Sequence, residues 1–113
     1  MDDYFYYQEE DRRFRFFAIP KVLLTHPYYA CLRCEAKFLY GLLLDRVALS
    51  KKNGWKDEFG RIFVYYSIKN IMKDLNCAHG KAEKLLVELE EYGLVERKRQ
   101  GAGRPSILYP IPF

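Results

Sequence analysis

The chain has 113 residues, of which half are hydrophobic and 17% aromatic, and its formal net charge is +4. This length is typical of a single domain, and the apolar content is sufficient for a hydrophobic core. No apolar run approaches the roughly 20 residues of a membrane-spanning helix, and the acidic start lacks the order of a signal peptide. The odd number of cysteines argues against a disulfide framework, so we expect a cytoplasmic protein without a membrane partner.

The first third of the chain has weaker patterns than the rest. Residues 1–13 mix acidic and aromatic side chains without a period, and we interpret them as an N-terminal arm. Alternating apolar residues over 14–18 predict a short strand that Pro20 ends, because proline has no N–H for a ladder. Residues 22–24 continue as a turn or a short strand. The density of Phe and Leu over about 14–32 indicates a segment for dimerisation within the domain 14–113.

Residues 34–50 have the longest helical pattern. Their apolar stripe at helical spacing consists of Ala36, Leu39, Tyr40, Leu43, Leu44 and Val47. Phe38, Leu42 and Leu49 widen this stripe beyond what a small domain needs. The helix is therefore either simply the central core helix or a core helix whose second face also meets another subunit.

A polar, glycine-containing loop and a strand follow this helix. Residues 51–60 form the predicted loop. Residues 61–66 are rich in β-branched and aromatic side chains and are predicted to form a strand that pairs with later strands of the domain.

Two short amphipathic helices separated by a tight turn come next. Ser67 is placed to cap the first helix, and Asn76 and Cys77 interrupt the pattern. Gly93 stands where a left-handed cap would end the second helix. The apolar positions at i, i+3, i+4 and i+7 are Ile68, Ile71, Met72 and Leu75 in the first helix, and Ala82, Leu85, Leu86 and Leu89 in the second.

The last part of the chain predicts a basic β-hairpin. Residues 97–104 contain four basic side chains and no acid, whereas residues 1–11 contain five acids and no base. The order helix, strand, helix, helix, strand, wing, strand is that of a winged helix-turn-helix, a mainly α fold with a small β-sheet (α+β). This module usually binds duplex DNA, although a charge run can also be a solvated face or a protected sheet edge.

The second helix of the pair is the predicted recognition helix, and the hairpin is the predicted wing. A recognition helix presents its N-terminal turns to the major groove, while basic wing residues reach phosphates or the minor groove. Glu83 is predicted to form a surface ion pair with a nearby lysine, rather than to read a cytosine amine. The candidate DNA-binding residues are Lys69, His79, Lys81, Lys84, Arg97, Lys98, Arg99, Gln100 and Arg104.

The cysteines permit a metal hypothesis that the spacing does not support well. Cys31 and Cys34 form a CxxC pair, which Cys77, His26 and His79 could complete as a tetrahedral zinc site. A second CxxC is lacking. A structural role for each cysteine, as a small residue at a helix cap or as a buried residue, is a simpler interpretation than a zinc site. No catalytic triad or phosphate-binding loop is recognisable, so we expect no metal, no cofactor and no enzymatic activity.

Several short motifs, taken in order, resemble one family. They are Ile19-Pro20-Lys21, Ala36-Lys37, Leu39-Tyr40, residues 42–46, Leu49-Ser50, Asn53, Trp55, Asp57-Glu58, Gly60, residues 93–95, residues 99–101, Pro105 and Tyr109. From about residue 17 to residue 110 the chain resembles the N-terminal domain of RepA-type replication initiators of theta-replicating plasmids from low-GC Gram-positive bacteria. Cys34 stands where that family commonly has serine, and His79-Gly80 falls in a variable part of the recognition helix.

The resemblance implies a winged-helix initiator that binds repeated sites in double-stranded DNA at the plasmid origin, typically as a homodimer. It also implies that the origin lies within the initiator's own gene, and that a separate C-terminal region acts with host replication proteins. Two alternatives share the fold. One is a winged-helix transcriptional regulator, which would bind a promoter operator, and the other is a winged-helix protein-interaction module that touches no DNA.

Overall fold

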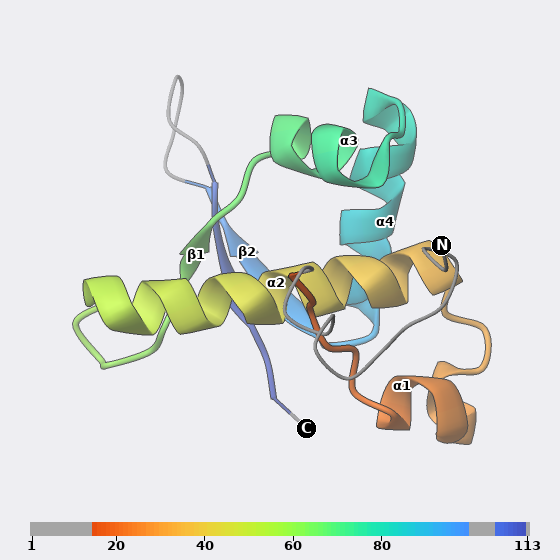
Figure 1. Ribbon diagram of the computed structural model, residues 1–113, viewed down its shortest axis with the longest axis horizontal. Coiled ribbons are helices and arrows are strands. Elements are labelled where there is room, and N and C mark those ends of the chain that lie inside the picture. Colours follow the sequence, from red (N-terminus) through yellow and green to blue (C-terminus); the bar gives the residue numbers. More distant parts are fainter. Residues whose placement is uncertain (1–14, 100–105, 113) are drawn as a thin grey trace, which may run out of the picture.

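The helix α2 (Cys34–Asn53) is the element against which most of the other elements pack. The computed structural model describes residues 15–99 and 106–112 (Figure 1). The predicted helix 34–50 is confirmed and continues to Asn53, because Gly54 adopts a left-handed φ of 73° and ends it. Four residues of the predicted stripe, Ala36, Leu39, Tyr40 and Leu43, are buried, and Leu44 and Val47 pack at its margin.

The elements that follow α2 have the predicted order. They are β1 (Val64–Tyr65), α3 (Ile68–Leu75), α4 (His79–Glu91), β2 (Val95–Lys98) and β3 (Ile107–Pro110). Two further elements, α1 (Val22–Thr25) and the 3-10 helix η2 (Pro27–Tyr29), precede α2. This arrangement is the winged helix-turn-helix expected from the sequence. Within the described ranges, none of the helices has the length and apolar character needed to cross a membrane.

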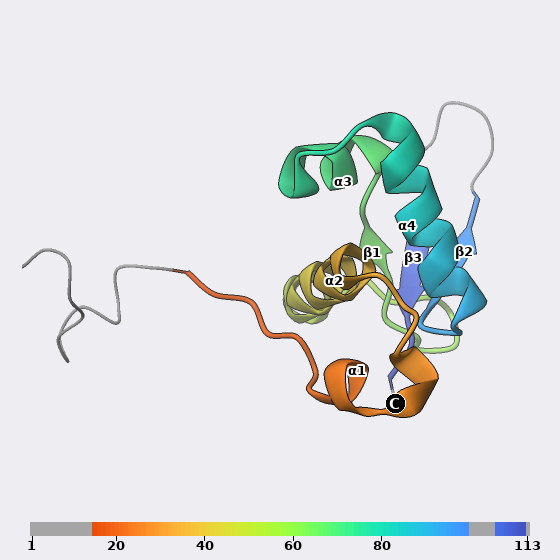
Figure 2. The same cartoon turned by 90° about the vertical axis from the view of Figure 1, so that its right-hand side faces the viewer.

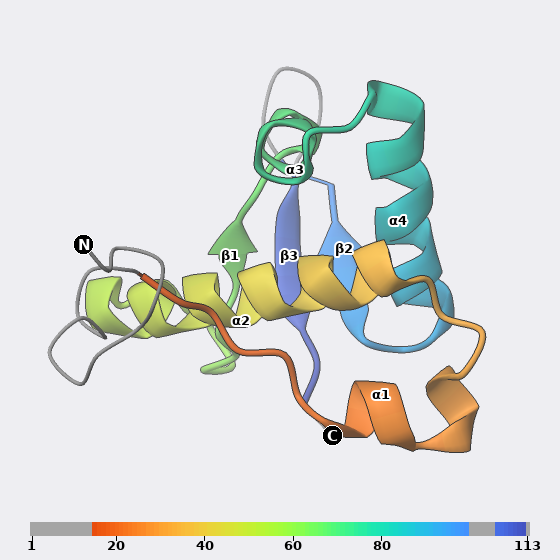
Figure 3. The same cartoon turned by 45° about the vertical axis from the view of Figure 1, so that its right-hand side comes forward.

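The three strands form one antiparallel sheet in the order β1-β3-β2, and α2 crosses its face (Figure 3). β2 and β3 pair from Val95 opposite Pro110 to Lys98 opposite Ile107. Ile111 extends the pairing between β2 and β3, since its N–H donates to the Leu94 carbonyl. Its own carbonyl accepts from the Tyr40 hydroxyl at 2.7 Å, and this bond fixes the C-terminal end of β3 to α2.

Both ends of α3 are set by local chemistry. Ser67 and Asn70 form a reciprocal capping box, in which the Asn70 N–H donates to Ser67 Oγ and the Ser67 N–H donates to Asn70 Oδ1. Such a cap stabilises a helix by about 1 kcal/mol. Asn76 ends α3 in the left-handed region, at φ 51°. The predicted boundaries of this helix are therefore confirmed.

The end of α4 determines where the wing begins. Gly93, at φ 73°, donates its N–H to the Glu90 carbonyl at 3.0 Å, and Leu94 donates to the Leu89 carbonyl at 2.9 Å. These two bonds are the Schellman motif, which a residue with a Cβ adopts only with strain. The predicted left-handed cap is confirmed, and the chain leaves it directly into β2.

The predicted strand over 14–18 is wrong for residues 15–18, whereas Phe14 lies outside the described residues. This segment crosses α2 on the side away from the sheet, and its first residues extend away from the helix (Figure 2). The Ala18 carbonyl and the Phe17 and Ile19 side chains approach Gly41 so closely that a Cβ there would lie 2.9 Å from each. A helix offers no free ladder groups, so the segment contacts α2 without becoming a strand.

Residues 22–24 belong to the single helical turn α1, so the strand alternative is wrong and the turn alternative is the better description. Leu24 and Thr25 both donate their N–H to the Lys21 carbonyl, and Leu23 is fully buried. One helical turn contains too few residues to show a helical period in the sequence.

The predicted strand 61–66 is longer than the observed one. Only Val64 and Tyr65 join the sheet, opposite β3 as expected. The preceding residues pair locally instead, because the Asp57 N–H donates to the Arg61 carbonyl and Lys56 bridges to Ile62. The predicted loop 51–60 is wrong at two places. Residues 51–53 belong to α2, and Lys56 forms a β-bridge with Ile62.

Asp57 holds this local turn together. Its Oδ1 accepts the N–H groups of Phe59 and Arg61, each at 2.9 Å. Its Oδ2 accepts Arg61 Nε at 2.8 Å and the Tyr109 hydroxyl at 3.1 Å. Partial burial opposes ionisation, but the bonds donated by Arg61, Phe59 and Tyr109 outweigh it and lower the pKa of Asp57 to about 2.

Replacing Asp57 is expected to change the acid stability of the domain. Because the folded pKa lies below the ordinary 3.8, ionised Asp57 stabilises the fold above that value, and this contribution is lost as the pH falls toward 2. Asp57→Asn should therefore lower the thermal midpoint at neutral pH and should converge with the parent protein near pH 2. If the thermal midpoints of the two proteins differed by the same amount at every pH in this range, ionised Asp57 would not be the group that stabilises the fold.

Candidate nucleic-acid interface

One end of the molecule gathers the elements that a helix-turn-helix protein presents to a ligand. The helix α3, the start of α4, and the ends of β2 and β3 that flank residues 100–105 all lie at the top of Figures 1 and 3. The two helices pack on each other through the buried Ile71 of α3 and the buried apolar face of α4. The surface of this end is therefore built from the outward faces of α3, α4 and β2.

The helix α4 carries three of the nine predicted contact residues, His79, Lys81 and Lys84. His79, Lys84 and Val87 are exposed there. Ala78 caps the helix without a side-chain bond, and the first turn contains no acidic residue. The unpaired N–H groups and the positive end of the helix dipole therefore favour an anion at this terminus.

Lys81 is exposed but engaged. Its Nζ lies 2.6 Å from Glu35 Oε2 in the first turn of α2. This bond is the main cause of the lowered pKa of the Glu35 carboxyl. The ion pair joins the start of α4 to the start of α2, and it directs Lys81 toward α2.

Three acidic residues of α4, Glu83, Glu88 and Glu90, are paired with arginines. Glu83 bonds to Arg97 of β2, so the predicted surface pair exists but its cation is an arginine from the wing instead of a lysine. Glu88 accepts the Arg33 N–H at 2.7 Å and lies 3.3 Å from its Nε. Neither arginine was recognisable as a partner from the sequence, because each lies far from its acid along the chain.

The predicted wing cations differ in exposure. Lys98 and Arg99 are exposed at the end of β2, whereas only 10% of the Arg97 side chain is accessible. Gln100 and Arg104 lie outside the described residues. β2 ends at the same end of the molecule at which α4 begins (Figure 3). The exposed Lys98 and Arg99 at the end of β2 therefore lie at this end, whereas the Arg97 guanidinium bonds to Glu83 and Glu90 of α4.

The helix α3 contributes Lys69 and Lys73, both exposed. Its orientation is fixed by three residues that the sequence did not single out. The buried Tyr66 hydroxyl donates to the Asp74 carboxylate, and the Arg46 guanidinium of α2 lies 4.9 Å from the centre of the Tyr66 ring. Burial and this hydrogen bond both raise the pKa of Tyr66. The three residues join α2, the residue that follows β1, and α3.

The cysteines have positions that the sequence suggested only in part. Cys34 is the first residue of α2 and Cys77 follows the cap of α3, as expected. Cys31 and Cys34 are exposed rather than buried, and Cys77 is half-buried. Across residues 15–99 and 106–112, no three His, Cys, Asp or Glu side chains are grouped closely enough to hold a metal ion.

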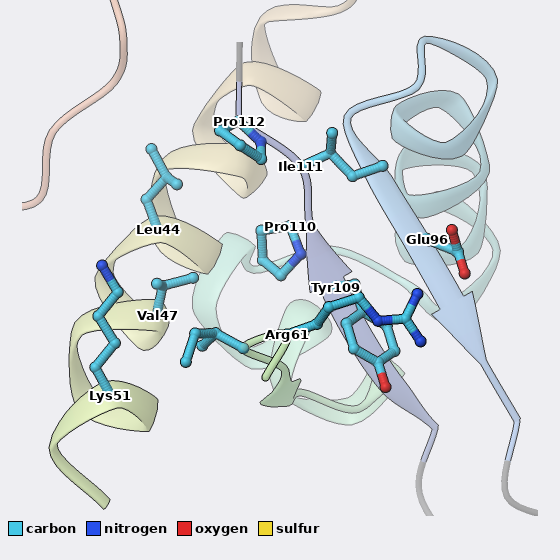
Figure 4. A pocket seen from close by; sticks show the side chains of 10 residues that line it. Leu44, Val47, Lys51, Arg61, Glu96, Tyr109, Pro110, Ile111 and Pro112 are labelled. Carbon is cyan, nitrogen blue, oxygen red and sulfur yellow. The ribbon is translucent and has the colours of Figure 1, made fainter. Parts of the chain in front are cut away.

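An apolar groove of about 500 Å³ lies between the second half of α2 and β3 (Figure 4). Leu44 and Val47 form one wall, and Pro110 and Ile111 form part of the other. Its charged groups do not converge, since Lys51 and Glu96 stand on opposite sides and Arg61 is bonded to Asp57. The groove therefore presents an apolar surface rather than a set of catalytic groups.

Comparison with known families identifies the domain. Residues 15–113 match the family described as replication initiator protein A (RepA) N-terminus. The chain belongs to this family. The resemblance inferred from the sequence motifs is therefore confirmed, and so is the winged-helix fold.

Three solved structures resemble this RepA N-terminal domain. An N-terminal domain of a DNA binding protein is 40% identical, with a TM-score of 0.78 over 96% of this chain and 82% of that chain. A Rep–DNA complex is 40% identical, with a TM-score of 0.79 over 96% and 83%. A structure of an MDR initiator is 37% identical, with a TM-score of 0.77 over 96% and 85%.

A curated relative gives the same family context. A 41 kDa protein of Lactobacillus helveticus is 30% identical over 86 residues, which are 76% of this chain. The chain spans about a quarter of the length of that relative, since the match covers 24% of it.

Proposed function

We propose that this domain binds double-stranded DNA sequence-specifically at repeated sites of a plasmid replication origin, as the N-terminal domain of a replication initiator. The observation that carries the proposal is that α4, with the exposed His79 and Lys84, begins at the end of the molecule where β2 ends with the exposed Lys98 and Arg99 (Figure 3). Concentrated cations release counterions from phosphates, and an exposed helix start of this kind enters a major groove. The family and the similar Rep–DNA complex support this reading.

In the proposed complex, α4 enters the major groove with its first turns. His79 and Lys84 would contact bases or phosphates there, while Lys69 of α3 would contact the backbone. Lys98 and Arg99 would hold flanking phosphates or enter the minor groove. Gln100 and Arg104, which lie outside the described residues, remain predicted DNA contacts of the same wing.

The proposed role is positioning without catalysis. A homodimer would place two recognition helices in successive major grooves, and the resulting complex would recruit host replication proteins through other parts of a full-length initiator. A transcriptional regulator with the same fold would differ only in its target, since it would bind a promoter operator.

The deciding experiment is fluorescence anisotropy with labelled duplexes cut from the protein's own coding region, measured across a salt series. Tight binding to one repeated segment with a steep salt dependence is the expected result. Equal weak binding to every duplex would mean that the domain binds DNA without sequence specificity, through its basic residues alone. A folded sample that binds no duplex would overturn the proposal in favour of a protein-interaction module.

The dimer surface proposed from the sequence has structural support in its exposed apolar residues. Phe16 is 76% exposed and Leu24 is 64% exposed in the N-terminal segment. On α2, Phe38 and Leu49 are 45% and 43% exposed. We propose that the segment over about 14–32 and this outer face of α2 form the contact between two copies of the chain.

Gly41→Ala is expected to weaken the proposed dimer roughly tenfold. The added Cβ would lie 2.9 Å from the Ala18 carbonyl, so the N-terminal segment must leave its place on α2. Alanine is favoured over glycine in a helix by about 1 kcal/mol, so α2 itself should persist. Sedimentation equilibrium measures the effect, with Gly80→Ala as the matched control because open space surrounds that glycine. An unchanged dimer in folded Gly41→Ala would exclude this segment from the interface.

A further inference from the structure

The guanidinium of Arg97 joins the wing to two turns of the recognition helix. Its Nη1 donates to both carboxylate oxygens of Glu83, at 3.2 and 3.0 Å, and its Nη2 donates to Glu90 Oε1 at 2.8 Å. Only 10% of its side chain is exposed, against 37% and 32% for the two glutamates. This arrangement is a bifurcated ion-pair cluster that spans β2 and α4.

The cluster follows from the geometry of both elements. Glu83 and Glu90 are seven residues apart, which places them on the same side of a helix. Arginine has a planar fork of donors that can serve two carboxylates at once, whereas lysine is a single point charge. Burial opposes the charge on Arg97, but the bonds to Glu83 and Glu90 outweigh it and raise its pKa. The charge is therefore permanent.

Neighbouring residues of a strand point to opposite faces, and this separates the roles of the wing cations. Arg97 faces α4, while Lys98 beside it is exposed. The adjacent basic residues are therefore not equivalent, although the sequence predicted DNA contact for all of them.

We infer that Arg97 is a positioning residue that holds the wing against the recognition helix and neutralises Glu83 and Glu90, and that it does not contact phosphate itself. The inference rests on the proposed DNA binding. Two uncompensated carboxylates on α4 would repel the phosphates beside the groove, and a detached β2 would release Lys98 and Arg99 from their register with α4. Arg97 thus supports affinity and specificity through other residues.

The test compares Arg97→Gln with Lys98→Gln in the anisotropy assay. We expect Arg97→Gln to lower the ratio of specific to non-specific binding on the order of tenfold while the salt slope stays unchanged. Lys98→Gln should weaken binding to all duplexes about equally and reduce the slope by about 0.9. Adding Glu83→Gln and Glu90→Gln to Arg97→Gln should recover the part of the affinity that the repelling carboxylates removed. The specificity ratio should stay low in this triple variant, because the wing is still not bound to α4.

Two outcomes would overturn the inference. A slope that falls in Arg97→Gln as in Lys98→Gln, without recovery in the triple variant, would place Arg97 on phosphate. An Arg97→Gln protein that is folded and binds normally would remove any positioning role. If Arg97→Gln does not fold, Arg97→Lys retains one ion pair and is expected to show the same loss of specificity to a smaller degree.

A readout without DNA separates this inference from the proposed function. A double-mutant cycle between Arg97→Gln and Glu83→Gln, measured by thermal unfolding, reports whether the two side chains are coupled. If the parent protein bound no duplex, the proposed function would fail, and a positive coupling would still establish the link between α4 and β2. Absence of coupling would overturn the link itself.

Discussion

Lys84→Glu is expected to lower the affinity for the specific duplex on the order of a hundredfold, because an acid placed against phosphates costs several kcal/mol. Lys84 is exposed on α4, about one and a half turns from its start at His79, and it lies on the face opposite the buried Leu85–Leu86 pair. A cation at this position faces the groove whenever the first turns of α4 enter it. The same anisotropy assay measures the loss.

The matched control for this variant is Lys52→Glu. Lys52 is exposed in the last turn of α2, at the end of that helix remote from α4 (Figure 1). Both substitutions reduce the formal net charge from +4 to +2, because a positive residue becomes a negative one. If the two variants lost equal affinity, only the overall charge would matter, and α4 would not be the recognition element.

Leu89→Ala is expected to reduce the free energy of unfolding by about 3 kcal/mol. Leu89 is fully buried in the core cluster where α4 faces α2, so the truncation leaves a cavity. Its carbonyl also accepts the Leu94 N–H in the cap that directs the chain into β2. For a domain of this size the thermal midpoint should fall by roughly 15 °C, as measured by calorimetry or circular dichroism.

Val87→Ala on the same helix is the control for this prediction. Val87 is 37% exposed, so its truncation should change the stability by no more than about 0.5 kcal/mol. Alanine is the strongest helix former, so helix propensity would not explain a loss of stability in either variant. A loss of similar size in both variants would mean that the burial of Leu89 is not the cause of the destabilisation. If Leu89→Ala changed the free energy of unfolding only slightly, α4 would not be packed on α2 as described.

The helix-turn-helix was predictable because its determinants are local. The Ser67 and Asn70 cap is closed within one turn, and Gly93 supplies a conformation that few other residues adopt without strain. The buried faces of α2, α3 and α4 repeat with the period of a helix, so each face was visible in a short window of sequence. These local signals, together with the order of the elements, were sufficient for the fold and for the family.

Strand extents were less predictable, because a strand requires a partner that the sequence does not name. Residues 61–63 have the composition of a strand, yet the Asp57 turn pairs them with the residues just before it. Residues 15–18 alternate as a strand would, yet Phe17 and Ala18 contact α2 at Gly41, where no ladder groups are free. Competition among possible partners decides such cases, and it is a property of the whole fold.

In the recognition helix, too, some properties of single side chains were predictable from local sequence and others depended on the whole fold. Its outward positions followed from periodicity, and His79 and Lys84 are exposed as expected. The ion-pair partners of its charged residues did not follow from periodicity. Glu83 bonds to Arg97 because β2 packs beside α4, and Lys81 bonds to Glu35, which lies 46 residues away along the chain. Local spacing therefore determined which residues face outward. Only the packing of α2, α4 and β2 decided which charges are neutralised, because ion pairing depends on distance in space rather than along the chain.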